Sequence, residues 1–331
     1  MIRRILTLVE PFILLLLGTV LLATLLPARG VWSTVASVAA DVGIVLLFFL
    51  HGAKLSREAV VDGARNWRLH LAVLGTTFLI FPLLGLAFGN LAALPPLVLQ
   101  GLLFLTLLPS TVQSSIAFTA IAHGNVAAAV CSASFSNLIG IALTPALVAL
   151  TIGGVGGEGA GVSIAAVEAI VLQLLVPFIV GHLLRPWIGE FVTRRKAVLS
   201  VVDRGSILLV VYAAFGAAVV EGLWHRVSAA DLALLALLCT LLLGIVMLFT
   251  TLLARLMKLE RGDAIVLLFC GSKKSLASGV PMAGVLFAPA QVGIVLLPVM
   301  LFHQIQLIAC AFIARRYADA ANDTGDADIA V

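Results

Sequence analysis

Long apolar stretches separated by short polar segments fill the chain from end to end. A helix that spans a bilayer needs about 20 predominantly apolar residues, and ten segments fit this description. They lie at residues 5–27, 33–52, 69–89, 97–122, 126–151, 162–184, 206–221, 229–254, 264–287 and 291–314. The pattern therefore predicts an all-α membrane protein with ten transmembrane helices, the seventh of which is the shortest.

Composition and charge agree with this prediction. Of the 331 residues, 62% are hydrophobic and 11% are charged, whereas an ordinary soluble domain has about 25% charged residues. Sixteen of the 20 Lys and Arg residues, Lys54 and Arg204 among them, are assigned to loops on the side of the N-terminus, and only Arg29 and Arg226 to the other side. Because cytoplasmic loops are enriched in Lys and Arg, we expect both termini in the cytoplasm, with the protein in a bacterial inner membrane.

Ten membrane spans divide into two sets of five. Because five is odd, the second set enters the membrane from the opposite side, which is the inverted-repeat geometry of many secondary transporters. The boundaries predict one domain over residues 1–317, with repeat one at about 1–151 and repeat two at about 162–317. Residues 318–331, rich in Asp, Ala and Asn, are predicted to form a disordered cytoplasmic tail.

Spans four and nine are interrupted by polar residues. The fourth contains PSTVQSS, from Pro109 to Ser115, and the ninth contains GSKKS, from Gly271 to Ser275. Proline lacks an N–H and clashes with the preceding turn, so a break is expected there. Seven residues lie between each interruption and the cytoplasmic boundary of the membrane. At 1.5 Å per helical residue, both interruptions are expected about 10 Å from that boundary. Irregular backbone at this depth is tolerated only inside protein or along a cavity, so the two interruptions are expected to meet.

Lys273 and Lys274 are adjacent within the ninth span. A Lys at mid-helix costs roughly 2.5–3.5 kcal/mol, and such residues usually line a ligand site or a water path. Two plainer alternatives stay open: the lysines extend to the membrane surface from a shorter span, and Pro109 is an ordinary kink. His303 and Gln304 in the last span are equally compatible with structural bonding and with substrate contact. The candidate substrate-binding residues are Thr111, Gln113, Ser114, Ser115, Ser272, Lys273, Lys274, Ser275, His303 and Gln304.

Three segments carry a resemblance to a known family. They read LLFFLHGAKLS, LLPSTVQSSIAFTAIAHGNVAAAVCSASFSNLIGIALTP and LFCGSKKSLASGVPMAGVLF. The chain resembles the bile acid:sodium symporter family, and within it the bile-acid-symporter-like branch, over about residues 2–317. The resemblance implies a panel of spans 1, 2, 6 and 7 and a core of spans 3, 4, 5, 8, 9 and 10. In that core the broken helices 4 and 9 cross, and substrate binds beside the crossing.

The chain departs from this family at the sodium site. The resemblance implies a span-nine carboxylate as a sodium ligand, but Phe269 or Cys270 stands there, and the following Gln-Asn pair is replaced by Lys273 and Lys274. An ammonium group supplies a compact charge with three donors, so a lysine can take the place of the ion. The residues that remain as candidate sodium ligands are Gln113, Ser114 and Ser115; Ala129 and Ala133 stand at positions where the family has hydroxyls.

Together these features predict a secondary active transporter of a small organic anion that works by alternating access. One lysine is expected to hold the crossing together, and the other to meet the substrate. Sodium and proton both remain as the coupling ion, and no other cofactor is expected. Two alternatives stay open: a sodium-coupled symporter of a bile-acid-like or other organic anion, and a non-transporting regulatory membrane protein.

Other classes of protein are disfavoured. No H-E-x-x-H motif and no intramembrane Asp pair occurs in the expected core, so we expect neither an enzyme nor a catalytic residue. Basic residues scattered over separate loops do not form the continuous basic face that nucleic acid requires, so the expected partners are bilayer lipids and the substrate. The sequence does not predict the substrate's identity or the oligomeric state.

Overall fold

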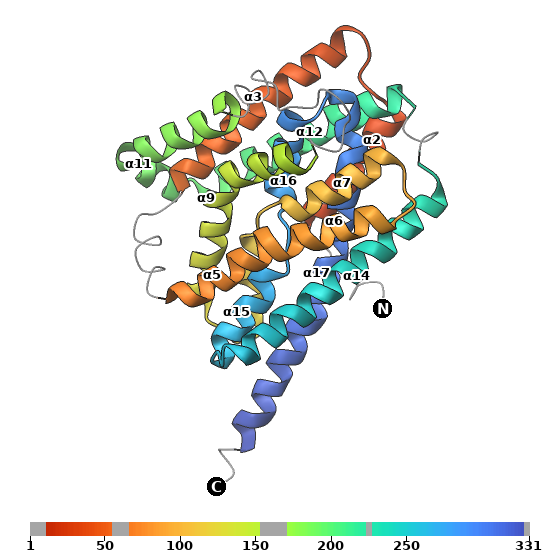
Figure 1. The fold of residues 1–331 in the computed structure, drawn as a ribbon. Coiled ribbons are helices and arrows are strands. Elements are labelled where there is room, and N and C mark those ends of the chain that lie inside the picture. Colours follow the sequence, from red (N-terminus) through yellow and green to blue (C-terminus); the bar gives the residue numbers. More distant parts are fainter. Residues whose placement is uncertain (1–10, 55–65, 153–170, 223–226, 328–331) are drawn as a thin grey trace.

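The computed structural model describes residues 11–54, 66–152, 171–222 and 227–327, and the structural statements below refer to these ranges (Figure 1). Within them the chain is helical and contains no strand. Seven of the described helices are long and apolar enough to cross a membrane: Val31–Lys54, Trp67–Asn90, Val126–Thr151, Val171–Val192, Ala197–Val220, Ala229–Leu256 and Pro289–Ala320. The protein is therefore an all-helical integral membrane protein.

The helices follow the order of the predicted spans. Their bounds are α2 Pro11–Leu25, α3 Val31–Lys54, α5 Trp67–Gly75, η2 Thr76–Ile80, α6 Phe81–Leu91, α7 Pro96–Leu107, α8 Gln113–Ile121, α9 Val126–Thr151, η3 Val171–Leu175, α11 Val176–Arg194, α12 Lys196–Val220, α14 Ala229–Leu256, α15 Arg261–Gly271, α16 Leu276–Leu286 and α17 Pro289–Ala327. The segments η2 and η3 are single π-helical turns.

Non-helical residues separate α7 from α8 and α15 from α16. The first helix pair is divided at Pro109, whose missing N–H and ring cannot continue the helix. The second is divided after Gly271, and α16 begins at Leu276 after the N-cap Ser275, whose hydroxyl accepts a hydrogen bond from the N–H of Ser278 at 3.1 Å. The polar residues of both predicted interruptions thus lie between helices or at their first turns.

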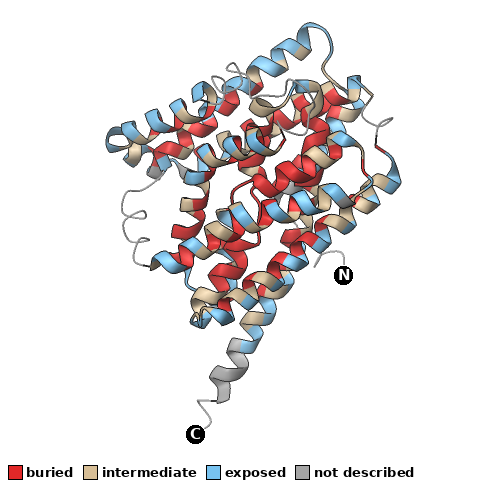
Figure 2. Cartoon of the chain, in the orientation of Figure 1, coloured by how far each residue is buried: buried red, intermediate tan, exposed pale blue. Residues whose placement is uncertain are grey.

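Packing divides the helices into two groups. Helix α3 packs along α11 and α12, and α2 packs against α12; we call these four helices the panel. The other group, the core, contains α5 to α9 and α14 to α17. Helix α17 contacts α7, α14 and α16 and also joins the panel through α12. The fully buried residues concentrate where the helices meet, whereas the outward faces are exposed (Figure 2).

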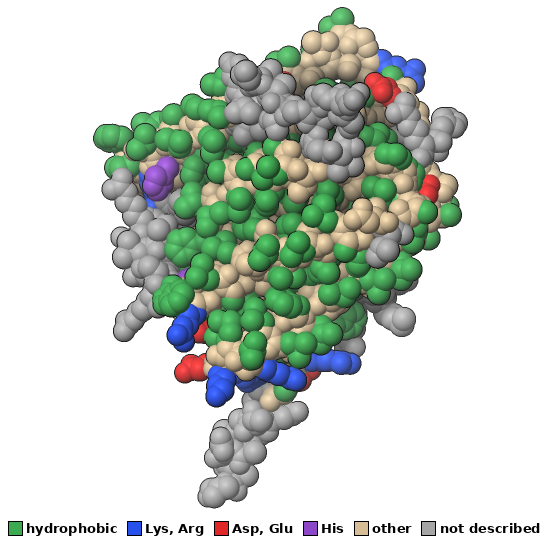
Figure 3. All heavy atoms as spheres, viewed as in Figure 1, with side chains coloured by type: hydrophobic (Ala, Val, Ile, Leu, Met, Phe, Trp, Pro, Cys, Tyr) green, Lys and Arg blue, Asp and Glu red, His purple; other side chains and the backbone are tan. Residues whose placement is uncertain are grey.

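The exposed faces are apolar, as a lipid environment requires. Large hydrophobic side chains lie exposed along the outer sides of the helices, for example Leu21 on α2, Leu183 on α11 and Leu248 on α14. Figure 3 shows hydrophobic side chains over most of one face, with most of the visible Lys and Arg gathered at the end from which α17 projects. Acyl chains can contact such a surface without leaving polar groups unsatisfied.

Several boundaries differ from those predicted. Helix α12 begins at Lys196, not near residue 206, because Ser200, Asp203 and Arg204 line a cavity between the helices and lower the apparent hydropathy. Helix α3 also reaches Lys54 and α11 reaches Arg194, so Lys54, Arg194 and Arg204, which were assigned to loops, belong to helices. Helix α17 runs to Ala327 and so extends into the predicted disordered tail. Alanine is a strong helix former, and an existing helix adds further residues easily.

The panel depends on two glycines at which α3 and α11 cross. A Cβ at Gly52 would overlap the carbonyl of Phe178, and one at Gly181 would overlap the carbonyl of Phe49. Only residues without a side chain let two helix backbones approach so closely. We expect Gly181→Val to lower the free energy of unfolding by about 1–3 kcal/mol, the usual cost of overpacking, as measured by thermal unfolding in detergent.

The control is Gly244→Val, because nothing lies within 4 Å of a Cβ at that position of α14. It should unfold at the temperature of the native protein. Equal stability of the two variants would contradict the close crossing.

Candidate functional site

The two non-helical segments are in direct contact. The N–H of Ser275 donates to the carbonyl of Pro109 at 2.8 Å, and the hydroxyl of Ser110 donates to the carbonyl of Cys270 at 2.6 Å. Helix α9 supports the contact, because the side-chain amide of Asn137 donates to the carbonyl of Ser110 at 2.8 Å. Irregular backbone at membrane depth is thus satisfied by protein groups, as it must be where water is absent.

Lys274 occupies the centre of this contact. Its side chain is buried, and its ammonium donates three hydrogen bonds of 2.7 Å, to the backbone carbonyls of Thr77, Thr106 and Leu108. A lysine ammonium has three donors, so all of them are used. The Nζ atom also lies 4.2 Å from the ring centroid of Phe81, which adds a cation–π contact. One side chain therefore binds together η2, the end of α7 and the interruption before α16.

The three carbonyls are available for reasons that the sequence explains. Those of Thr106 and Leu108 belong to the C-terminal end of α7, where carbonyls lack intrahelical partners and the helix dipole favours a cation. That of Thr77 lies in the π-helical turn η2, in which the N–H of Phe81 bonds to the carbonyl of Thr76. The next residue, Pro82, has no N–H. The carbonyl of Thr77 is consequently left for Lys274.

Gln306 completes this arrangement, and sequence reasoning missed it. Its buried side-chain amide accepts from the N–H of Lys274 and donates to the carbonyl of the same residue, both at 2.9 Å. The same amide contacts Nδ1 of His303 at 2.8 Å. The available signal was spacing, because Gln306 lies one helical turn after His303. The predicted Gln304 points elsewhere, and its Nε2 is buried with no partner in the described part of the chain.

Lys273 has a different environment. It is fully buried, and its Nζ lies 4.3 Å from the ring centroid of Phe118 and 5.4 Å from that of Phe269. No residue that the structure describes accepts a hydrogen bond from this nitrogen. Aromatic faces attract a cation, but they replace hydrogen bonds only in part. The two adjacent lysines thus differ sharply in how their ammonium groups are satisfied.

A cavity of about 330 Å³ lies between the panel and the core. Five of the predicted site residues line it, namely Thr111, Gln113, Ser114, Ser275 and His303. The other five lie outside its lining: Ser115, Ser272, Lys273, Lys274 and Gln304. Its apolar walls come mainly from the panel and α9, and they include Phe12, Leu47, Phe48, Leu138, Ile141, Phe178 and Ile207.

The core side of the cavity presents two helix N-termini. Helix α8 begins at Gln113, and no side chain caps its first turn; α16 begins at Leu276, and both helix starts belong to the lining. Backbone N–H groups at a helix N-terminus, together with the helix dipole, attract anions. Neutral polar groups surround them, including Asn137, whose side-chain carbonyl accepts from the hydroxyl of Ser278 at 2.8 Å. This side of the cavity therefore suits a negatively charged group.

The panel side carries charged residues that sequence reasoning did not place in the site. Lys54 of α3 and Asp203 of α12 form an ion pair, and both line the cavity with His51 and Arg204. They were missed because the hydrophobic pattern ended the second span before Lys54 and began the seventh after Arg204. Lys54 and Arg204 are basic side chains on this wall, and basic groups favour an anionic ligand.

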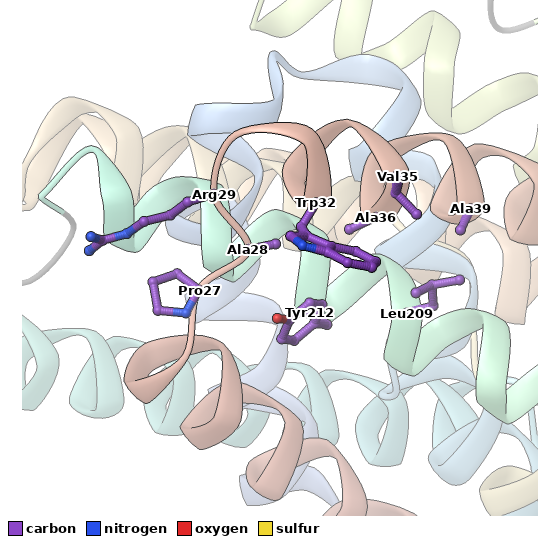
Figure 4. Close-up of a pocket in the computed structure, with 9 residues that line it drawn as sticks. All are labelled: Pro27, Ala28, Arg29, Trp32, Val35, Ala36, Ala39, Leu209 and Tyr212. Atoms are coloured by element: carbon purple, nitrogen blue, oxygen red, sulfur yellow. The ribbon is translucent and has the colours of Figure 1, made fainter.

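A second hollow, of about 520 Å³, lies on the outside of the panel between the α2–α3 connection, α3 and α12 (Figure 4). Tyr212 closes its base, with its hydroxyl donating to the carbonyl of Leu26 at 2.9 Å. Its charged lining residue, Arg29, points away from Trp32 (Figure 4). The hollow lacks converging polar groups and is not the candidate site.

Two of the three candidate sodium ligands, Ser114 and Ser115, are bonded to the hydroxyl of Thr111. That hydroxyl lies 2.9 Å from the hydroxyl of Ser114 and 2.8 Å from that of Ser115, and Ser115 also donates to the carbonyl of Phe269 at 3.2 Å. The third, Gln113, lines the cavity. Among the described residues, no group of three or more His, Cys, Asp or Glu side chains is placed to hold a metal ion.

A helical membrane protein with a polar cavity between two helix groups has the architecture of a membrane transporter. The chain matches the model of the SBF-like CPA transporter family over residues 10–319 and belongs to that family. This confirms the resemblance to bile acid:sodium symporters and places the protein among transporters rather than enzymes.

Proteins similar to this chain match it over most of its length and of their own. Protein PA2026 of Pseudomonas aeruginosa is 55% identical over 322 residues, covering 96% of each chain. YfeH of Escherichia coli, whose name describes a symporter, is 50% identical over 310 residues, covering 93% of this chain and 92% of its own. Sodium/bile acid cotransporter 7 of Rattus norvegicus is 24% identical over 273 residues, covering 81% and 79%.

The cavity can be tested by thiol labelling. In a background without Cys131, Cys239, Cys270 and Cys310, all of which are buried, we expect Gln113→Cys to react with a membrane-impermeant maleimide, because this side chain is exposed and lines the cavity. Labelling is read by mass spectrometry.

Ser272→Cys is the matched control, since Ser272 is fully buried and its hydroxyl donates to the carbonyl of Leu268. It should stay unlabelled. Protection of Gln113→Cys at the level of the control would contradict a water-filled cavity.

Proposed function

We propose that this protein is a secondary active transporter of a small organic anion and that it works by alternating access. The observation that carries the proposal is the cavity between panel and core, in which the N-termini of α8 and α16 face the Lys54–Asp203 pair and Arg204. Helix N-termini and basic side chains on opposite walls attract one negative group, and the apolar walls accommodate the rest of an amphipathic molecule.

The proposed site is narrower than the predicted one. Thr111, Gln113, Ser114, Ser275 and His303 contact the substrate, and Lys54 and Arg204 join them from the panel. Lys274 holds the crossing of the interrupted helices, in the role that a bound sodium ion has in related symporters. Lys273 is not assigned to substrate, because it lies between two aromatic rings outside the cavity lining.

The proposed mechanism uses the two helix groups as the moving parts. Two inverted repeats of five spans each, with the divided helices 4 and 9 crossing in the core, place the site at the interface of panel and core. Sliding of the core along the panel opens the cavity to either side in turn. The excess of basic residues in loops on the N-terminal side supports cytoplasmic termini, as is usual for short loops of a bacterial inner-membrane protein.

Transport is tested with purified protein in proteoliposomes. Radiolabelled benzoate, octanoate and benzenesulfonate serve as probes, and the sodium and pH gradients are imposed separately. We expect saturable uptake of at least one probe, loss of that uptake in Lys54→Gln, and little response to sodium. The control, Arg194→Gln, changes a basic residue on the exposed side of α11 and should transport normally. Absence of uptake and of binding for all the probes would contradict the proposal.

The role of Lys274 is tested through stability. Lys274→Gln removes the charge and leaves at most two donors on a shorter side chain, so at least one of the three buried carbonyls loses its partner at a cost of about 1–3 kcal/mol, around a space of the kind that a sodium ion fills. We expect the thermal unfolding temperature of this variant to rise with sodium chloride relative to choline chloride at equal ionic strength, because a ligand that binds only the folded state stabilises it.

The native protein and Lys273→Gln should show no such difference between the salts. Saturable stabilisation of the native protein by sodium would contradict the replacement of the ion by lysine.

A further inference from the structure

Asp203 is the one carboxylate among the described residues that line the cavity. One of its oxygens, Oδ2, pairs with the ammonium of Lys54, while Oδ1 is buried and has no hydrogen-bond partner in the described ranges. The side chain of Asp203 is 18% exposed and that of Lys54 is 34% exposed, so water screens the ion pair only in part. A half-satisfied carboxylate on the wall of a ligand cavity is costly to maintain, which points to a function.

The surroundings of Asp203 contain a small number of titratable or charged groups. From the described residues of the cavity lining these are His51 and Lys54 on α3, Arg204 on α12 itself and His303 on α17. Helices α2, α11 and α16 contribute only uncharged residues there, including Phe12, Phe178 and Ser278. The ring of His51 is held by its Nδ1, which donates to the carbonyl of Leu47 at 2.9 Å.

An anion that enters this cavity competes with Asp203 for Lys54. Helix N-termini attract the anion on the core side, and Lys54 on the panel wall can supply a charge-assisted hydrogen bond to it, as Arg204 can. Once Lys54 turns to the anion, the carboxylate of Asp203, which is largely buried, loses its partner. Burial and the loss of a cationic partner both favour the neutral form of a carboxylate over its charged form.

We propose that Asp203 is the proton-coupling site. The substrate anion replaces Asp203 as the partner of Lys54, and the freed Asp203 carboxylate binds a proton from water in the open cavity. This rests on the anion transport proposed above. One anion and one proton enter together, so the net charge of the site is unchanged. When the anion leaves on the other side, Lys54 and Asp203 pair again and the proton returns to water there. Substrate and proton therefore move in the same direction.

The experiment measures proton uptake on binding. Benzenesulfonate and naphthalenesulfonate are suitable probes, because a sulfonate stays ionised and any proton taken up must reside on the protein. Purified native protein in weakly buffered detergent is mixed with each probe; binding is followed by calorimetry and proton uptake by a pH-indicator dye. We expect the native protein to take up a proton for each anion bound. Asp203→Asn should bind the anion without taking up a proton.

Glu190→Gln is the matched control, because Glu190 also pairs with a basic residue, Arg194, but on the exposed side of α11. It should behave as the native protein does. Infrared difference spectra of the native protein provide a test without any variant: anion binding should produce the carbonyl band of a protonated carboxyl group.

The outcomes separate the two proposals. Anion binding by the native protein with neither proton uptake nor the carboxyl band overturns the coupling role of Asp203 and leaves anion transport standing. Uptake that persists in Asp203→Asn but disappears in His51→Gln places the proton on the imidazole and likewise overturns it. If none of the sulfonate and carboxylate probes binds, the transport proposal itself is overturned.

Discussion

The arrangement of the core depends on one buried ammonium group. Three backbone carbonyls, from Thr77, Thr106 and Leu108, converge on Lys274, and each would cost about 1–3 kcal/mol if left unsatisfied away from water. The interruptions are in direct contact, from Ser275 to Pro109, beside an end of α7 whose carbonyls are satisfied in this way. A covalently attached ammonium cannot dissociate, so on the proposed mechanism these carbonyls stay satisfied at any sodium concentration.

A permanent cation in the core changes where coupling can occur. If a bound sodium ion assembles the crossing, its arrival and departure can drive the transport cycle; on the proposed mechanism Lys274 takes that ion's place, so sodium binding there cannot drive it. On the proposed mechanism that role falls to the panel, where the Lys54–Asp203 pair lies on the cavity wall. A carboxylate there gains and loses a partner as the ligand comes and goes. On this mechanism the charge of the core stays constant through the cycle, while the charge state of the panel varies.

The hydrophobic pattern was sufficient to predict the helical membrane fold and the two polar interruptions, because a bilayer tolerates few polar residues and each must have a reason. It could not assign Asp203 and Arg204, since polar residues that face a cavity look like loop residues when only hydropathy is considered. Gln306 was missed for a different reason: its partner is a backbone amide exposed by the helix break, and backbone hydrogen bonding at irregular turns leaves little trace in a side-chain pattern.

Sequence reasoning expected the adjacent lysines to have two different functions. The geometry explains why they do not share the same surroundings. Within the non-helical segment, neighbouring side chains diverge. Lys274 reaches the end of α7, where the helix dipole and free carbonyls favour a cation. Lys273 reaches the rings of Phe118 and Phe269 instead, which attract a cation but accept no conventional hydrogen bond. Two like charges could not both occupy the carbonyl site. The second ammonium is therefore accommodated by aromatic faces, and on the proposed mechanism the substrate's charge is met by residues of the panel and by the two helix N-termini.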